Sequence, residues 1–302
     1  MMMIFFSPDL ANDMSKDEQQ WLDRLNRIGM VYFRPLVMSI LKNGKSEFER
    51  INVFQRIERF IFIAFRMNSA RANYRSSEFY NAARSIDRSE INIGRIAEKL
   101  EEGLSYTLNL DGTLKINDFY NILFKKFERQ VGYYDWYGLR YFLYEYELSL
   151  LSESRQKKVD WSDLLRKEKD KISIEHIYPQ TETEEWASYF DNIDEANRRY
   201  YNATLGNLLL LSMSINSALQ NDSFADKKNA KFDEENRKIR NGYADGSHSE
   251  IEVSQQTTWG PDQIRERGLN LLRFMEKRWD FSFKNDEERK NLLFINFGDK
   301  AK

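Results

Sequence analysis

Cysteine is absent from the 302-residue sequence, and histidine occurs only twice. The lack of cysteine excludes disulfide scaffolds, thiolate nucleophiles and cysteine-bound zinc. With only four prolines and thirteen glycines, the composition favours long helices. Apolar runs such as 60–65 and 208–211 fall far short of the ~18–20 residues that a membrane span needs. The apolar start at 1–6 is too short for a signal-peptide core. We therefore expect a soluble, cytoplasmic protein.

A large charge of one sign is also missing. Lysine and arginine together number 46 and acidic residues 48, which gives a net charge of −2. Because hydrophobic residues make up 41% and aromatic residues 14%, the chain can bury a core and is not expected to be disordered. Any surface that binds nucleic acid must be local, since the chain as a whole carries no positive excess.

The first half of the sequence has the periodicity of helices. Ser15-x-x-Glu18 is a capping-box pattern followed by apolar residues at helical spacing, and Pro35 is expected to break or kink that stretch. Further helices are predicted near 54–65, 80–104, 117–131 and 139–151. The polar segment 157–170 suggests a boundary. We therefore predict a helical region over 1–156 and a second domain over 157–302.

The second half has a different pattern. Residues 171–179 alternate β-branched and polar side chains, which predicts a strand that Pro179 ends. A long connection leads to a second strand at 205–212, a helix over 213–232 and a loop-like segment over 241–258. A last helix is predicted over 262–279. The expected fold is mainly α, with an embedded ββα unit.

The chemistry of this half centres on one histidine. His176 stands beside Glu175 at the end of the predicted strand. A neutral imidazole suits the activation of water at neutral pH. The oxygens of Glu175 and of Asn216 are of the kind that Mg²⁺ binds. Neighbouring strand residues point to opposite faces, so Glu175 and His176 share a site only where the strand ends or bends. Pro179 makes such an ending plausible.

These residues resemble a known family. Glu175-His-Ile-x-Pro, followed by Leu205-Gly-Asn-Leu-x-Leu-Leu-Ser and then Asn216, resembles the HNH (His-Me finger) nuclease pattern. More specifically, the segment is similar to the C-terminal nuclease domain of GmrSD-type, modification-dependent restriction enzymes. The resemblance implies a ββα-metal core and a nuclease that cuts DNA with Mg²⁺, Mn²⁺ or another divalent cation, in defence against foreign or modified DNA.

The family's roles transfer to the matching positions of this sequence. By resemblance, His176 is the general base, Glu175 and Asn216 are the metal ligands, and Asn207 supports the histidine and its loop. The basic residue beyond the helix, Lys227 or Lys228, would contact phosphate.

The sequence departs from the family in two ways. The usual acid is Asp, whereas Glu175 is one methylene longer. The sequence also contains no nucleotide-binding loop, although the family joins its nuclease domain to a ParB-like nucleotidase domain. The chain is therefore a stand-alone effector, a partner of a separate nucleotidase subunit, or a fragment, and these alternatives stay open.

Other interpretations of the same residues also stay open. Asn207 fits a turn, Asn216 fits a helix N-cap, and His248 fits a solvated loop. The basic residues from Lys227 on are interrupted by acidic ones, as on an ordinary solvated helix. The aromatic stretch 133–146 fits base stacking, core packing or subunit contact. Two alternative functions follow: a non-catalytic structural or interaction subunit of a restriction-type complex, and a nuclease that acts on RNA.

Overall fold

The structure is a computed structural model that describes residues 14–29, 31–154, 161, 173–211, 219 and 221–296. It is mainly helical, as predicted, with four short strands in the described ranges. The chain divides into two compact units. Unit 1 runs to Phe119 and includes Trp279–Ser282, and unit 2 comprises Tyr120–Arg278 and the residues from Phe283 on.

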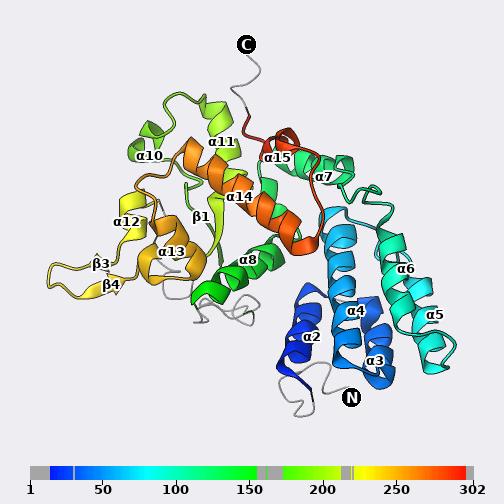
Figure 1. Cartoon of the computed structure of the whole chain (residues 1–302). Coiled ribbons are helices and arrows are strands. Elements are labelled where there is room, and N and C mark those ends of the chain that lie inside the picture. The colour runs from blue at the N-terminus through cyan, green and yellow to red at the C-terminus, as the bar shows by residue number, and fades with distance from the viewer. Residues whose placement is uncertain are drawn as a thin grey trace. The chain divides into compact units, whose positions relative to one another are not determined.

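The described part of unit 1 is built of α-helices, a short 3₁₀ helix and a π-helix (Figure 1). Its elements are α2 (Lys16–Ile28), η2 (Val31–Phe33), α3 (Arg34–Asn43), α4 (Glu47–Phe60), η3 (Ile61–Met67), α5 (Ser76–Asp87) and α6 (Gly94–Leu104), and α7 (Asn117–Glu128) begins there and continues into unit 2. The single helix predicted near 80–104 is thus two helices, because the chain turns between Asp87 and Gly94.

Local sequence signals explain the ends of these helices. The Ser15 side chain caps α2 by accepting a hydrogen bond from the Glu18 backbone N–H at 3.2 Å, as the capping pattern predicted. The helical stretch that begins at Lys16 is broken before Pro35, which does not kink a helix but lies in the first turn of α3, where its missing N–H costs nothing. Trp279 stacks on Phe62 of η3 and donates to Glu58 at 2.9 Å. This contact ties the 279–282 segment into unit 1.

Unit 2 surrounds a pair of strands with helices. Its further elements are η4 (Gly132–Asp135), α8 (Leu139–Ser154), β1 (Ser173–His176), α10 (Glu184–Ser188), α11 (Glu195–Ala203), η5 (Leu205–Asn207), β2 (Leu208–Leu211), α12 (Phe224–Lys228), β3 (Lys231–Phe232), β4 (Lys238–Arg240), η6 (Tyr243–Asp245), α13 (His248–Ser254), α14 (Pro261–Trp279) and α15 (Asp286–Leu292). The last helix begins at the proline that was expected to start it.

The two predicted strands pair with each other. β1 and β2 are antiparallel, with Glu175 opposite Leu209 and His176 opposite Leu208. All four residues of β2 are buried, and both α8 and α13 pack against that strand. The apolar strand therefore holds β1 and its polar end in a fixed position against the core of unit 2.

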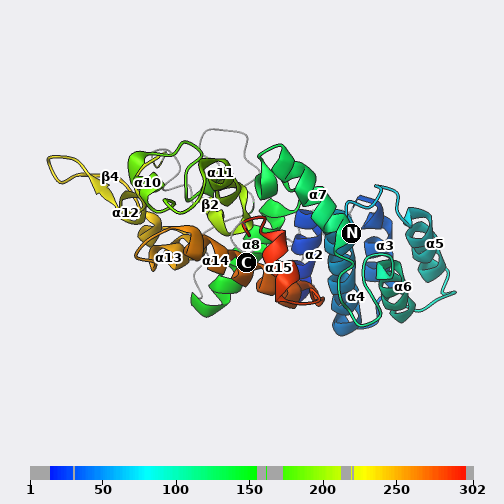
Figure 2. The same ribbon diagram turned by 90° about the horizontal axis from the view of Figure 1, so that it is seen from above.

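Two predicted segments differ from the structure. Most of the first part of the helix predicted over 213–232 lies outside the described residues, and within the described part only α12 (Phe224–Lys228) is helical, followed by β3 at Lys231. The hairpin of β3 and β4 projects from the rest of unit 2 in both views (Figures 1 and 2). The loop expected over 241–258 contains α13, which begins with a capping box between Ser247 and Glu250.

The predicted boundary at residue 156 does not coincide with the division into units. α8 lies before that boundary, yet it packs on β2 and α13 within unit 2. In the part of the chain that the structure describes, no helix combines the length and the apolar character needed to span a membrane.

Candidate active site

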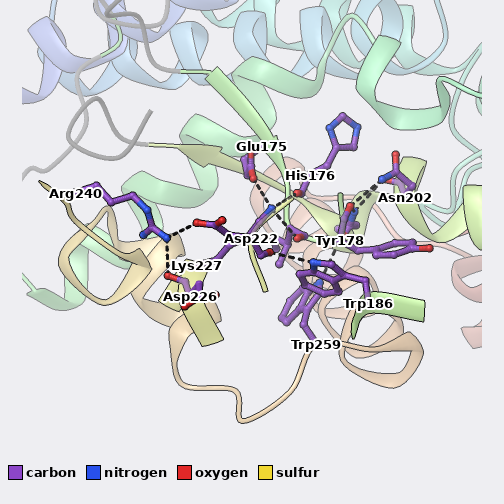
Figure 3. A network of polar contacts seen from close by, with 12 residues as sticks. Glu175, His176, Tyr178, Trp186, Asn202, Asp222, Asp226, Lys227, Arg240 and Trp259 are labelled. Atoms are coloured by element: carbon purple, nitrogen blue, oxygen red, sulfur yellow. Dashed lines mark hydrogen bonds and ion pairs between the residues drawn. The ribbon is translucent and has the colours of Figure 1, made fainter. Parts of the chain in front are cut away.

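The acid–histidine pair lies at the end of β1. Beyond His176 the chain leaves the strand, and the Ile177 backbone N–H donates to the Asn207 carbonyl at 3.0 Å. Figure 3 shows the Glu175 carboxylate directed toward Lys227, whereas the His176 ring points away from that lysine. The strand alternation that separates neighbouring side chains thus still operates at this position.

Lys227 of α12 is buried against the strand end. Its side chain has no exposed surface, and its ammonium lies 2.8 Å from Glu175 Oε1. The same ammonium donates to the backbone carbonyls of His176 and Ile177 at 3.1 and 3.0 Å. Burial lowers the pKa of Lys227, and the Glu175 carboxylate opposes that shift. The lysine therefore fixes both the carboxylate and the backbone beside the histidine.

The segment that carries Lys227 is itself fixed by a buried arginine. Arg240 donates to the Asp222 carboxylate at 2.7 Å and to the Asp226 carbonyl at 2.9 Å. The Asp222 carbonyl in turn accepts from Trp186 Nε1 at 3.0 Å. These contacts fix Asp222 and Asp226, which lie on either side of the first residue of α12. The position of Lys227 beside β1 is thereby fixed as well (Figure 3).

Asn207 holds the turn that follows β1. Its side-chain oxygen accepts from the Tyr178 N–H at 2.8 Å and from Trp259 Nε1 at 3.1 Å. Its amide nitrogen donates to the carbonyls of Tyr178 and Asn202 at 2.9 and 3.1 Å. The residue is fully buried. An amide is the only neutral side-chain group that offers two donors and an acceptor in this geometry, which explains the choice of Asn.

The His176 ring lies at a partly exposed position. The ring of Tyr134 lies 4.8 Å away between centroids, tilted by 30°. The Gln180 amide nitrogen is 3.5 Å from His176 Nε2. Burial lowers the pKa of His176 to about 4, and the positive charge of Lys227 adds to that shift. The imidazole is consequently neutral near pH 7 and has a lone pair to accept a proton.

The predicted site residues are thus brought together in part. Glu175, His176 and Asn207 lie around the end of β1, but the Glu175 and His176 side chains point in different directions, and Asn216 lies outside the described residues. Lys228 points elsewhere and donates to the Gln256 carbonyl at 2.7 Å. The expectation that Lys227 contacts phosphate needs correction, because its buried ammonium already has three acceptors.

The donor chemistry fits a hard cation. Lys227 occupies Glu175 Oε1, and Oε2 has no partner in the described ranges. The Glu175 side chain is 19% exposed, so the carboxyl-bearing side chain is partly open to solvent. Among those residues no cluster of three His, Cys, Asp or Glu side chains forms a site for a metal. A cation here would need amide and water oxygens, which Mg²⁺ accepts.

Sequence reasoning missed several residues that shape this site. Trp259 and Tyr134 come from segments distant in sequence, whereas Asn202 lies five positions before Asn207, and the sequence offers no local signal for any of these contacts. Arg267 of α14 is another: it donates to the Gly206 and Leu208 carbonyls at 2.9 and 2.8 Å. Arg267 thereby holds the backbone on both sides of Asn207 against α14.

Comparison with known families identifies the family to which the chain belongs. A family model described as "GmrSD restriction endonucleases, C-terminal domain" matches residues 119–274. The chain belongs to this family. The GmrSD match begins within one residue of unit 2 and contains β1, β2, α12 and most of α14. Membership in a restriction endonuclease family implies nuclease activity and a DNA substrate. No curated protein matches the chain.

Proposed function

We propose that this protein is a metal-dependent endonuclease that hydrolyses DNA phosphodiester bonds with HNH-type chemistry. The observation that carries the proposal is the position of His176. It is a partly exposed imidazole at the end of β1, and the carboxylate of the preceding residue, which points in a different direction, is held in place by a buried lysine. This constellation lies within the region that matches the GmrSD family.

His176 is the proposed general base. Its ring takes a proton from the attacking water, and general bases of this kind contribute about 10²- to 10⁴-fold to a rate. Tyr134 covers part of one face of the ring and limits its movement. Asn207 holds the backbone immediately after the strand, so the ring keeps its direction.

Glu175 and Asn216 are the proposed ligands of a divalent cation such as Mg²⁺ or Mn²⁺. When bound, such a cation stabilises the charge that grows on phosphate and on the leaving oxygen. Lys227 acts on the carboxylate rather than on the substrate: it fixes one oxygen of a side chain that stays partly exposed. A contact between Lys228 and phosphate is also proposed, because its ammonium has three donors and, among the described residues, only one of them is bonded, to the Gln256 carbonyl.

The biological setting is proposed from the family. Defence against foreign or modified DNA in the cytoplasm, with a ParB-like nucleotidase as a partner subunit, agrees with a restriction endonuclease domain. We expect the partner to supply nucleotide hydrolysis, because this sequence contains no nucleotide-binding loop.

A nicking assay tests the proposal. Supercoiled plasmid is incubated with the protein in Mg²⁺ or Mn²⁺, with and without EDTA, and a structured RNA is incubated in parallel. Nicking of the plasmid that EDTA abolishes, with slower cutting of the RNA, is the expected result. DNA cleavage that persists in EDTA would contradict metal dependence, and cutting of RNA alone would contradict the assignment of the substrate.

A further inference from the structure

A polar groove opens beside the candidate general base. It has a volume of about 570 Å³ and lies between the 178–182 turn and α11. Gln180 lines the groove, and its amide nitrogen is the group found 3.5 Å from His176 Nε2. We call this feature the α11 groove. Its volume is in the range of sites that hold a small ligand or a nucleotide.

Most of the charge within the α11 groove is already compensated. Arg198 forms an ion pair with Glu182 at 3.1 Å and also donates to the Ile193 carbonyl at 2.9 Å. The Tyr178 hydroxyl donates to the same glutamate at 2.8 Å. These three side chains therefore form a neutral, cross-linked wall that serves the structure of the groove.

Arg199 differs from its neighbour. It lines the groove and is exposed, and in the described part of the chain no carboxylate lies within ion-pair distance of it. Its guanidinium lies over the Tyr200 ring, 5.7 Å from the centroid. Glu195, one helical turn earlier, also lines the groove and is exposed. Among the described residues that line the groove, Arg199 and Glu195, four positions apart on α11, are the charged side chains that form no ion pair.

We propose that the α11 groove binds the sugar–phosphate backbone of the DNA strand beside the scissile bond, with Arg199 contacting a phosphate. The proposal rests on the proposed nuclease function. The planar guanidinium matches phosphate oxygens. Amide and hydroxyl groups such as those of Gln180 and Thr181 are common additional partners of the DNA backbone. Because the net charge is −2, attraction to DNA must come from local cations of this kind.

The test is DNA affinity rather than cleavage. A short fluorescein-labelled duplex is titrated in EDTA, where no metal supports cutting, and fluorescence anisotropy gives the dissociation constant between about 50 and 200 mM salt. Arg199→Gln is expected to weaken binding about 5-fold and to reduce the slope of log K against log salt by about 1. Thr181→Glu is expected to weaken binding as well, because it adds a negative charge to the groove.

One variant has the opposite expected sign. Glu195→Gln removes a negative charge from the groove and should tighten binding. The matched control is Arg273→Gln, which removes an exposed arginine of α14 outside the groove and should leave affinity and slope near those of the wild type. Circular dichroism and urea unfolding confirm that all four variants are folded.

The proposal is overturned if Arg199→Gln keeps wild-type affinity and slope, or if it changes no more than Arg273→Gln. A wild-type protein without affinity for the duplex at the lowest salt would overturn it too. The outcome separates this proposal from the nuclease function. If the wild type cuts DNA while Arg199→Gln binds normally, only the groove proposal is wrong. If binding responds as expected while His176→Ala cuts normally, only the nuclease mechanism is wrong.

Discussion

Gly206 and Ile264 approach each other so closely that a Cβ atom on Gly206 would lie 1.9 Å from the Ile264 carbonyl oxygen. The close contact sets the N-terminal half of α14 directly against the turn that carries Asn207. It gives a physical reason for the glycine of the Gly-Asn-Leu motif, because any side chain would push helix and turn apart. Arg267 one turn later bonds to the same segment.

The first prediction follows from this contact. Gly206→Ala is expected to destabilise the protein by about 3 kcal/mol, since a backbone carbonyl cannot move aside as a flexible side chain can. Gly260→Ala is the control, because a Cβ there would meet its nearest atoms at 3.6 Å, an ordinary contact distance. Urea unfolding measures both variants. Equal stability of the two would contradict the account of the motif.

The second prediction concerns the buried lysine. Lys227→Met is expected to lower the free energy of unfolding by about 2–3 kcal/mol, because it leaves two carbonyls and a partly buried carboxylate without their donor. Because Glu175 is partly exposed, the loss of unfolding free energy should be smaller than for a fully buried ion pair. Lys228→Met, next in sequence but with one carbonyl partner, should cost much less. Thermal or urea denaturation distinguishes the two.

A functional measurement separates positioning by Lys227 from contact with phosphate. The Lys227→Met variant should bind Mn²⁺ more weakly, because its Glu175 carboxylate is no longer held, while its affinity for DNA in EDTA stays near the wild-type value. A loss of DNA affinity with unchanged Mn²⁺ binding would instead support contact with phosphate. Isothermal titration calorimetry reports the metal affinity.

The third prediction concerns Asn207. Asn207→Asp keeps the acceptor for Tyr178 and Trp259 but places an oxygen against two carbonyls. Burial raises the pKa of the introduced carboxyl above its unfolded value near 3.9. At low pH the introduced carboxyl is therefore protonated in the folded state and donates a hydrogen bond to one of the carbonyls. Stability relative to wild type is therefore lost as pH rises above about 4.

The measurement is urea unfolding of Asn207→Asp and wild type at several pH values between about 4 and 8. The difference in unfolding free energy should grow with pH. Asn207→Ala, which introduces no titratable group, should show a difference that does not depend on pH. A flat profile for the Asp variant would mean that its carboxyl is solvated and that the buried hydrogen bonds of Asn207 do not fix the turn.

The fourth prediction concerns the aromatic ring beside the histidine. Tyr134→Ala is expected to lower the rate of DNA cleavage about 2- to 10-fold, since an aromatic contact contributes about 0.5–1.5 kcal/mol. Tyr134→Phe keeps the ring and should cut at nearly the wild-type rate. Single-turnover kinetics measure both. A large loss in the Phe variant would show that the hydroxyl, not the ring, matters.

The sequence predicted those parts of the site that depend on local pattern. The strand before Pro179, the apolar strand after Gly206 and the helix that starts at Pro261 all have short-range signals. The two strands were predicted as part of a ββα unit, and β1 and β2 do pair. The GmrSD resemblance was likewise found from a few closely spaced residues, and the family match confirms it.

The remaining features depend on contacts distant in sequence. Lys227 and Glu175 are 52 positions apart, and nothing near the lysine indicates that it is buried rather than solvated. α12 ends one residue after this lysine, and the β3–β4 hairpin follows. One local signal was present but not used: Ser247-x-x-Glu250 is a capping-box pattern that marks α13.

The two histidines of the chain provide the most direct test of the central claim. His176→Ala and His248→Ala make the same chemical change at the end of β1 and at the start of α13. The rate of plasmid nicking in Mg²⁺ is measured for both, with circular dichroism to confirm the fold. The account predicts a loss of about 10²- to 10⁴-fold for His176→Ala and a near-wild-type rate for His248→Ala. A folded His176→Ala variant that nicks DNA at the wild-type rate would contradict it.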